Sequence, residues 1–247
     1  NKIYSIKIKE DKDTIMRVLI TGAAGTVGKI VARGLYKDHE IKGFDLAPMP
    51  EIKDSIIGDL KDYEAVYNAV KGMDAVIHLG GLPGGDDWEG LLHSNFIGTY
   101  HIFEAMRQTN VKRIAYASRA GIFSPYPKSL KRTADLLPRP VGHYTVSKIF
   151  GESLAYSYSH QYSLECVCIR IGNFKLNRDL PEHPHHLSHG DCVRVFERAI
   201  THPDVKFETV FGVSASNWPM YDVEHGEKTI GYRPKDKSYV PKELWEQ

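Results

Sequence analysis

Apolar residues near the start of the chain follow the pattern of a short buried strand and then of an amphipathic helix. The run 18–21 is almost entirely apolar and ends at Gly22, and along 26–36 apolar residues recur every three or four positions. A continuous apolar run is typical of a buried strand, and a period of three to four residues is typical of one helix face. This opening segment is therefore predicted to form a strand, a tight turn and a helix.

The same order repeats along most of the chain. Further strands are predicted at 41–45, 56–58, 74–79, 113–118, 165–171 and 206–212, and helices at 63–71, 95–109, 147–160 and 191–199. The strands lack the polar alternation of a half-exposed sheet, which indicates a parallel sheet covered by helices on both faces. We therefore expect an α/β fold.

Composition and charge exclude several classes of protein. The 247 residues suit one large domain, and 32 basic against 31 acidic side chains produce no field that would attract nucleic acid or an anionic membrane. No apolar run approaches the roughly 18 residues of a membrane span. Cys166 and Cys168 alternate within an apolar run, so we expect them, with Cys192, to be buried reduced thiols. A soluble, cytoplasmic protein without nucleic-acid or membrane partners is predicted.

A glycine-rich turn lies between the first strand and the first helix. Close approach of a pyrophosphate forbids side chains there, and the helix that follows offers unpaired N–H groups and the positive end of its dipole. The turn is predicted to hold the phosphates of a dinucleotide through Gly22, Ala24, Gly25, Thr26, Val27 and Gly28. The alternative is an ordinary glycine turn. In its strand and helix context, the motif predicts a Rossmann-type doubly wound parallel sheet.

Residues at further strand ends extend this predicted site. Asp45 ends the second strand about twenty residues after the glycines, where a carboxylate accepts hydrogen bonds from ribose hydroxyls and repels a 2′-phosphate, so NAD is favoured over NADP. Two more groups follow strands at the edge where an open α/β sheet binds its ligand, although each is also compatible with a simple turn. They are Asp59 with Leu60, and Leu79 with Gly80 and Gly81.

Tyr144 and Lys148 are four positions apart, so at the start of a helix they lie on one face. A nearby ammonium group stabilises a phenolate and lowers the pKa of the tyrosine, which can then take a proton from a substrate hydroxyl. On its own the spacing is common on solvated helices. Downstream of the glycine turn, it predicts the catalytic pair of an NAD-dependent oxidoreductase.

Together these motifs resemble the extended or atypical short-chain dehydrogenase/reductases, the NAD-dependent epimerase/dehydratase superfamily. Further matching positions are Asn95, Gly98, Thr99, Arg170, Ile171, Gly172 and Asn173, and the resemblance runs from Met16 to about Lys237. Segments 139–152, 187–189, 212–217 and 231–236 look like those of the uronate dehydrogenases and related NAD-dependent aldose dehydrogenases. Those enzymes oxidise a cyclic sugar at its anomeric carbon to a lactone.

The resemblance implies roles for individual residues. Tyr144 would be the general base, and Lys148 would hold the nicotinamide ribose and tune the tyrosine. Beyond the strand ends already named, the residues expected to contact NAD are Asn95, Tyr144, Lys148, Ile171, Gly172 and Asn173. Those expected to contact the sugar are Pro83, Arg119, Ala120, Asn173 and His183.

The position of the family's catalytic serine is occupied differently in this chain. That serine should come just after the fifth strand, where this chain has Arg119, with Ser118 one position earlier. Ser118 is predicted as the third catalytic residue, acting through a shifted loop. Two alternatives stay open: Arg119 replaces the serine and binds an anionic substrate group, or catalysis is impaired. The loop 173–189 also places no arginine where uronate dehydrogenases hold the substrate carboxylate.

That loop carries a cluster of histidines: His183, His185, His186 and His189. Imidazoles suit zinc or nickel, but the loop has no paired cysteine or carboxylate pattern, so no metal is predicted. Solvated side chains, or one or two histidines in a substrate lid, are favoured instead.

Three parts are expected along the chain. Residues 1–15 would be an N-terminal extension, 16–172 an NAD-binding Rossmann domain that includes the catalytic helix, and 173–247 a small C-terminal substrate-binding region packed on the same domain. The predicted function is oxidation of a sugar, whether aldose, sugar phosphate or uronic acid. A sugar-nucleotide epimerase or dehydratase with tightly bound NAD and a non-catalytic dinucleotide-binding regulator are the alternatives. The resemblance also implies a homodimer paired through helices 95–109 and 147–160.

Overall fold

The computed structural model describes residues 14–85, 87–177, 179 and 182–244. The predicted N-terminal extension, 1–15, lies outside the described residues except for Thr14 and Ile15, which form no regular secondary structure.

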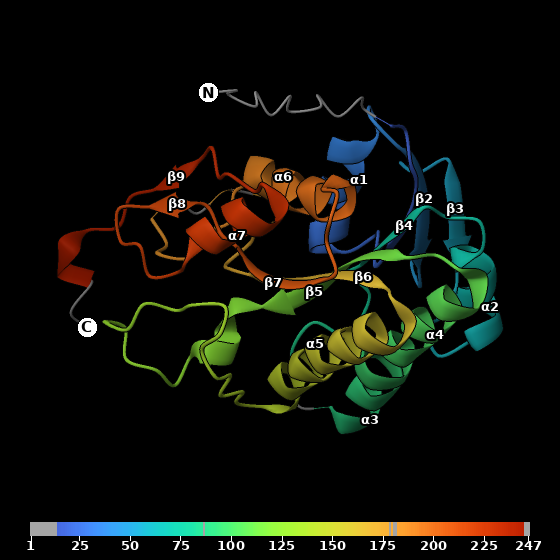
Figure 1. The fold of residues 1–247 in the computed structure, drawn as a ribbon, viewed down its shortest axis with the longest axis horizontal. Coiled ribbons are helices and arrows are strands. Elements are labelled where there is room, and N and C mark those ends of the chain that lie inside the picture. The colour runs from blue at the N-terminus through green and yellow to red at the C-terminus, as the bar shows by residue number, and fades with distance from the viewer. Residues whose placement is uncertain (1–13, 86, 178, 180–181, 245–247) are drawn as a thin grey trace, which may run out of the picture.

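A seven-stranded parallel sheet forms the centre of the described chain (Figure 1), in the order β3-β2-β1-β4-β5-β6-β7. Its strands are β1 Arg17–Thr21, β2 Glu40–Asp45, β3 Asp54–Ile57, β4 Ala75–His78, β5 Arg113–Arg119, β6 Glu165–Ile171 and β7 Phe207–Gly212. A two-stranded sheet pairs β8, Ala215–Ser216, with β9, Lys237–Ser238. The predicted Rossmann-type doubly wound sheet is confirmed.

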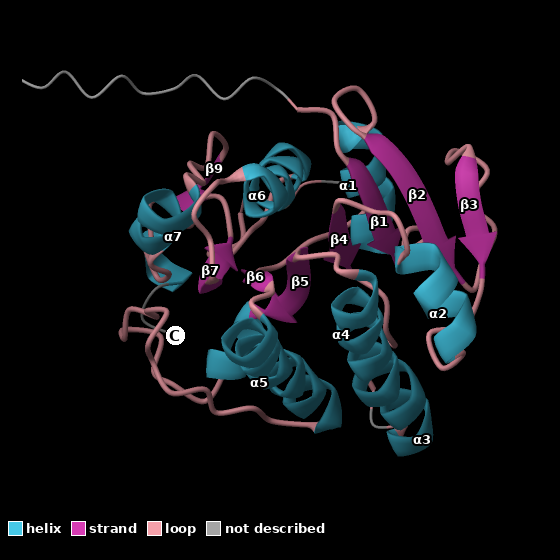
Figure 2. Cartoon of the chain, turned by 45° about the vertical axis from the view of Figure 1, so that its right-hand side comes forward, coloured by secondary structure: helices cyan, strands magenta, loops and turns pink. Residues whose placement is uncertain are grey.

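Helices cover both faces of the sheet (Figure 2). One face carries α1 (Thr26–Leu35) and α6 (His189–Thr201), with α7 (Val223–Ile230) beside α6. The other carries α2 (Tyr63–Val70), α4 (Gly98–Thr109) and α5 (His143–Tyr162). Shorter pieces are α3 (Trp88–Leu91), the π-helical segment Leu92–Ile97 and the 3₁₀ turns Ala120–Phe123 and Lys242–Leu244.

Some helices differ from the sequence prediction. Helix α5 begins at His143, four residues before the predicted start at 147, so both Tyr144 and Lys148 lie within it. Its start has no cap signal that a sequence could reveal, because the N-cap is Gly142 and no side chain bonds to the first turn. Residues 88–94, directly before the predicted helix 95–109, and residues 223–230 are helical although no element is predicted there.

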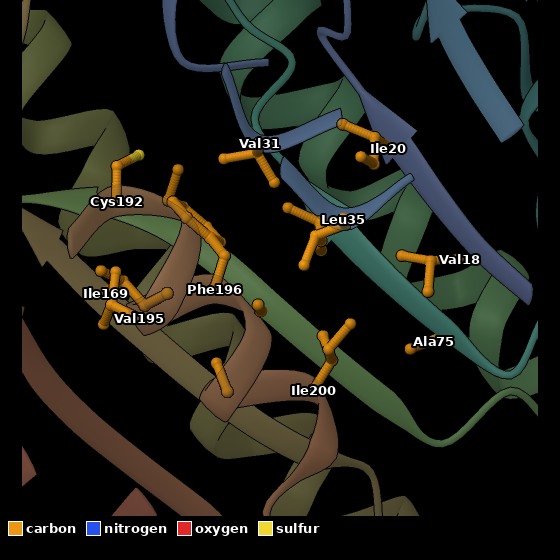
Figure 3. Close-up of a cluster of buried hydrophobic side chains, with 14 of the residues drawn as sticks. Val18, Ile20, Val31, Leu35, Ala75, Ile169, Cys192, Val195, Phe196 and Ile200 are labelled. Atoms are coloured by element: carbon orange, nitrogen blue, oxygen red, sulfur yellow. The ribbon is translucent and has the colours of Figure 1, made fainter. Parts of the chain in front are cut away.

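Alternation along β1 divides the core between the two faces of the sheet. Val18 and Ile20 point toward α1 and α6, where they pack with Leu35 and Phe196 (Figure 3), and Leu19 points to the opposite face. Burying each such side chain contributes about 1.5–3 kcal/mol. The two packed layers hold the strand ends at one edge of the sheet.

The chain changes direction across the sheet at β1. Strand β2 lies on one side of it and β4 on the other, so the loops after β1 and β4 diverge above and below the sheet. In an open α/β sheet a crevice forms at such a point, outside the carboxyl ends of the strands.

A buried carboxylate attaches the C-terminal segments to α6. Asp191 is fully buried and accepts hydrogen bonds from Ser214 Oγ at 2.6 Å and from the N–H groups of Lys235 at 2.8 Å and Asp236 at 3.1 Å. Arg194 forms an ion pair with it at 2.6 Å. This one side chain joins the start of α6 to the segments that flank β8 and β9.

Replacing Asp191 with asparagine should lower the free energy of unfolding by on the order of 3 kcal/mol, because an amide cannot accept all of these hydrogen bonds and leaves Arg194 without its buried partner. Urea unfolding followed by circular dichroism measures the loss. Asp38→Asn, at an exposed turn, is the control and should change the midpoint little. Equal stability of the two variants would contradict the role given to Asp191.

Candidate active site

The turn after β1 has no room for a side chain at the positions of Gly22 and Gly28. Gly22 has φ +69°, and a Cβ there would lie 2.7 Å from the Gly80 nitrogen. A Cβ on Gly28 would lie 2.2 Å from the Gly22 oxygen. Helix α1 starts immediately afterwards, with Gly25 as its N-cap and no side-chain hydrogen bond at that cap. Among the described residues, the N-terminus of α1 is therefore open to an anion, as a phosphate cradle requires.

Asp45 lies against this turn. Its Oδ2 accepts a hydrogen bond from the Ala24 N–H at 2.9 Å, and its Oδ1 accepts one from the Ala47 N–H at 3.0 Å. Each carboxylate oxygen retains a further lone pair, so the fixed group can still accept hydrogen bonds from ribose hydroxyls. The turn and the carboxylate together fit the adenosine and phosphate portions of NAD.

A cleft of about 830 Å³ runs along the carboxyl ends of the strands and collects most of the predicted site. The predicted residues that line it are Gly22, Ala24, Gly25, Thr26, Val27, Gly28, Asp45, Asp59, Leu60, Leu79, Gly80, Gly81, Pro83, Ser118, Arg119, Ala120, Tyr144, Lys148, Ile171, Gly172 and Asn173. Asn95 and His183 do not line it. Residues far apart in the sequence thus line one continuous cleft.

Asn95 supports the cleft from behind. It is buried, accepts a hydrogen bond from the Leu82 N–H at 2.7 Å, and donates one to Ser147 Oγ at 3.0 Å. Ser147 in turn donates to the Tyr144 carbonyl at 2.7 Å. The residue lies in the π-helical segment, a rare conformation that is frequent at functional sites. Asn95 therefore ties the loop after β4 to the turn of α5 that carries Tyr144.

Tyr144 and Lys148 occupy the first turns of α5. Lys148 Nζ lies 5.6 Å from the centroid of the Tyr144 ring and 5.4 Å from that of Tyr116. Burial, with a smaller effect of Arg119, lowers the pKa of Lys148 to about 8. Burial raises the pKa of Tyr144, and the positive charge of Arg119 opposes that rise. Burial thus disfavours the phenolate form of this half-buried tyrosine, and the charge of Arg119 works against that effect.

Ser118 lines the cleft, but its hydroxyl is hydrogen-bonded to a buried carboxylate. It donates to Glu152 Oε1 at 2.6 Å, and Arg170 binds the same carboxylate through Nε at 3.0 Å and Nη2 at 2.9 Å. Ser118 shares the face of β5 that carries Ile114 and Tyr116 toward α5, because side chains alternate along a strand. Its role as the third catalytic residue stays a prediction, which this hydrogen bond does not favour.

Arg119 is the next residue and has a different environment. Its guanidinium carbon lies 5.2 Å from the centroid of the Tyr144 ring, and Nη1 donates to Thr145 Oγ1 at 3.2 Å. The guanidinium of Arg119, at the end of β5, therefore lies beside the phenol and contacts the turn of α5 that carries Tyr144 and Thr145.

Sequence reasoning did not assign a role to Glu152 or Arg170, and it placed His185 only among the loop histidines of which one or two could form a substrate lid. Glu152 is eight residues after Tyr144, hence near its helix face, and its burial could have suggested a positioning role. His185 lines the cleft and a second, adjoining cavity. No group of three or more histidine, cysteine, aspartate or glutamate side chains suited to a metal ion occurs in the described part of the chain.

The three cysteines are buried and unpaired, as expected for reduced thiols. None of the helices in the described ranges has the length and apolar character needed to cross a membrane.

Comparison with known proteins agrees with this geometry. Residues 18–207 match the family described as the NAD dependent epimerase/dehydratase family. The chain belongs to this family.

Individual members with sugar substrates are similar over most of their length. A uronate dehydrogenase of Pseudomonas syringae pv. tomato is 36% identical over 235 residues, which are 91% of this chain and 83% of that protein. An NAD-dependent glucose-6-phosphate dehydrogenase of Haloferax volcanii is 32% identical over 247 residues, 90% of this chain and 94% of that protein. The crystal structure of a uronate dehydrogenase from Agrobacterium tumefaciens superposes with a TM-score of 0.83 at 32% identity, covering 91% and 86% of the two chains.

Membership confirms the predicted resemblance, NAD as the cofactor, and an NAD-dependent enzyme of the extended short-chain dehydrogenase/reductase type. The roles of single residues stay predictions.

Arg119→Met should move the acidic limb of the pH–kcat profile to higher pH. The guanidinium lowers the pKa of Tyr144, so its removal raises that pKa and the phenolate forms only at higher pH. Initial rates of NADH formation between about pH 6 and about pH 10 measure the shift. Arg233→Met, an exposed arginine paired with Glu227, is the control and should leave the profile unchanged. An unshifted profile in Arg119→Met would contradict this effect of the guanidinium.

Proposed function

We propose that this protein is a sugar dehydrogenase that uses NAD to oxidise a cyclic aldose, sugar phosphate or uronic acid at its anomeric hydroxyl. The observation that carries the proposal is the position of Tyr144 and Lys148, one helical turn apart, in the wall of the cleft that also contains the glycine turn and Asp45. Sequence identity of 30% to 36% to uronate and aldose dehydrogenases supports the substrate class.

The reaction divides the bond changes between cofactor and protein. NAD, when bound, supplies a hydride acceptor for the anomeric C–H bond. Tyr144 Oη takes the proton of the anomeric hydroxyl, so that a C=O bond forms and the sugar becomes a lactone. Lys148, positively charged below its pKa of about 8, stabilises the phenolate before the transfer and holds Tyr144 in place. The sugar lies between this pair and residues 171–173.

We further propose that residues 173–247 supply the substrate-binding region and 16–172 the cofactor domain. Segments 182–185 and 218–221 line the second cavity next to Arg119, whereas the glycine turn and Asp45 line only the cleft. The segment 119–132 of the cofactor domain completes the wall of that cavity, so both parts would contact the sugar while the cofactor domain alone supplies the glycine turn.

A cytoplasmic homodimer completes the proposal. Helices α4 and α5 lie side by side on one face (Figure 2), and they expose Tyr100 and Val146 next to the half-buried Phe96 and Phe150, whose ring centroids are 5.0 Å apart. Two such faces can bury these side chains against each other. Free buried thiols support a reducing compartment. Light scattering that returns the mass of a single chain would contradict the dimer.

Tyr144→Phe should lower kcat by about 100-fold or more, because it removes the acid–base group and leaves the ring in place. NADH absorbance with a panel of aldoses, sugar phosphates, uronic acids and sugar nucleotides measures this, with NADP as a parallel cofactor. Tyr36→Phe, exposed at the end of α1, is the matched control and should keep full activity.

The same assay separates the alternative functions. Net NADH from free sugars that disappears in Tyr144→Phe supports the dehydrogenase. Conversion of a sugar nucleotide without net NADH, by protein that retains NAD through purification, would replace it with an epimerase or dehydratase. Binding of NAD with no conversion of any sugar would indicate a regulator.

A further inference from the structure

A second cavity, of about 580 Å³, adjoins the cleft and shares Arg119, Ala120, Gly121 and His185 with it. The remaining lining residues are Phe123, Ser124, Tyr126, Lys128, Arg132, Glu182, His183, Pro184, Trp218, Met220, Tyr221 and Val240. Neither Tyr144 nor the glycine turn lines this second cavity, and Arg119 lies where it meets the cleft.

Arg132 is a buried cation in this wall. It is only 4% exposed, and its backbone is held by hydrogen bonds to Met220 and Asp222 at 2.8 and 2.9 Å. Its guanidinium donates to the carbonyls of Tyr126, Lys128 and Leu130, while Nε is buried without a hydrogen-bond partner among the described residues. Burial lowers the pKa of Arg132.

Other buried arginines of the described chain have a carboxylate partner. Arg170 pairs with Glu152 at 2.9 Å and Arg113 with Glu165 at 2.7 Å. Within the described ranges, neither Arg132 nor Arg119 forms such a pair. A buried cation that carbonyl oxygens alone compensate is costly, and an anion that enters the cavity removes that cost.

The two guanidinium groups act on the same part of the cavity. Burial raises the pKa of the Tyr221 phenol, and both guanidinium groups oppose that rise; its ring lies 5.7 Å from that of His185. Burial, with contributions from His183 and Arg132, lowers the pKa of His185 to about 4, so this imidazole is neutral at physiological pH. Its buried Nδ1 has no hydrogen-bond partner in the part of the chain that the structure describes. Glu182 is the acidic side chain among the described lining residues.

We propose that the second cavity binds an anionic group of the substrate, a phosphate or a carboxylate, between Arg119, Arg132 and His185. The inference rests on the proposed sugar oxidation and narrows its substrate to anionic sugars. The reacting hydroxyl faces Tyr144, and the anion lies beyond Arg119, against Tyr221 and Trp218. Arg119 thereby replaces the serine of the family as a substrate-binding residue.

Isothermal titration calorimetry of the unmodified protein with NAD present tests the charge preference directly. Glucose 6-phosphate, glucuronate and glucose are the probes, and at least one of the two anionic sugars is expected to bind at least about tenfold more tightly than glucose. Inorganic phosphate should compete with that sugar and not with NAD. The tighter of the two anionic sugars identifies phosphate or carboxylate as the group. Glucose binding as tightly as both would overturn the proposal, as would failure of both anionic sugars and of phosphate to bind.

Two variants locate the anion. Arg119→Ser restores the serine of the family, and Arg132→Lys keeps the charge while losing the forked donor set. Each should raise the Kd of the preferred anionic sugar roughly tenfold and leave that of glucose within about twofold. Arg233→Met is the matched control and should change neither. Unchanged Kd values in both Arg119→Ser and Arg132→Lys overturn the proposal, and unchanged NAD affinity verifies that each variant is folded.

Binding and turnover separate this inference from the proposed function. Tight binding of an anionic sugar without NADH formation would support the proposed anion site and contradict the proposed dehydrogenase function. NADH formation with equal kcat/KM from neutral and anionic sugars would support the dehydrogenase function and contradict the anion site.

Discussion

The buried ion pair between Glu152 and Arg170 fixes the geometry on which the site depends. It joins α5 to β6, and the hydrogen bond from Ser118 adds β5, so three elements meet at one carboxylate. The rings of Phe123 and Phe211 lie 5.1 and 5.8 Å from the Arg170 guanidinium and exclude water. Because removal of either partner leaves an uncompensated charge in the interior, α5 has one favoured height relative to the sheet. Tyr144 and Lys148 stand on that helix, and their position at the cleft follows from the pair.

Charge around Tyr144 distinguishes this chain from a site with a serine. A hydroxyl can only share a proton with the substrate, whereas the Arg119 guanidinium carries a permanent charge. Burial raises the pKa of Tyr144 and lowers that of Lys148. The charge of Arg119 opposes the first shift and adds to the second, so it favours both the phenolate and the neutral amine. The arginine therefore supplies a charge beside the phenol that a serine could not.

The parallel sheet and the turn after β1 could be predicted from the sequence because local signals encode them. A strand, a glycine turn and a helix are contiguous, and Asp45 follows at a regular distance, so periodicity and spacing locate them. The rest of the site depends on contacts between distant segments. The direction of the Ser118 hydroxyl depends on Glu152, and the second cavity needs Arg119, Arg132, His185 and Tyr221 to converge. No local pattern encodes such convergence, and the uncapped start of α5 hid the helix turn that carries Tyr144.

The C-terminal segments attached by Asp191 have a consequence for how this architecture diversifies. The second cavity is lined by residues from 182–185, 218–221 and 240, and by no residue of the glycine turn. The Asp191 carboxylate, at the start of α6, holds neighbouring parts of these segments in place. Amino-acid replacements on these segments would alter the shape and charge of the second cavity, while the contacts of Asp191 and the glycine turn stay the same. This separation would allow the substrate cavity to change by replacement of residues that do not contact the dinucleotide cradle.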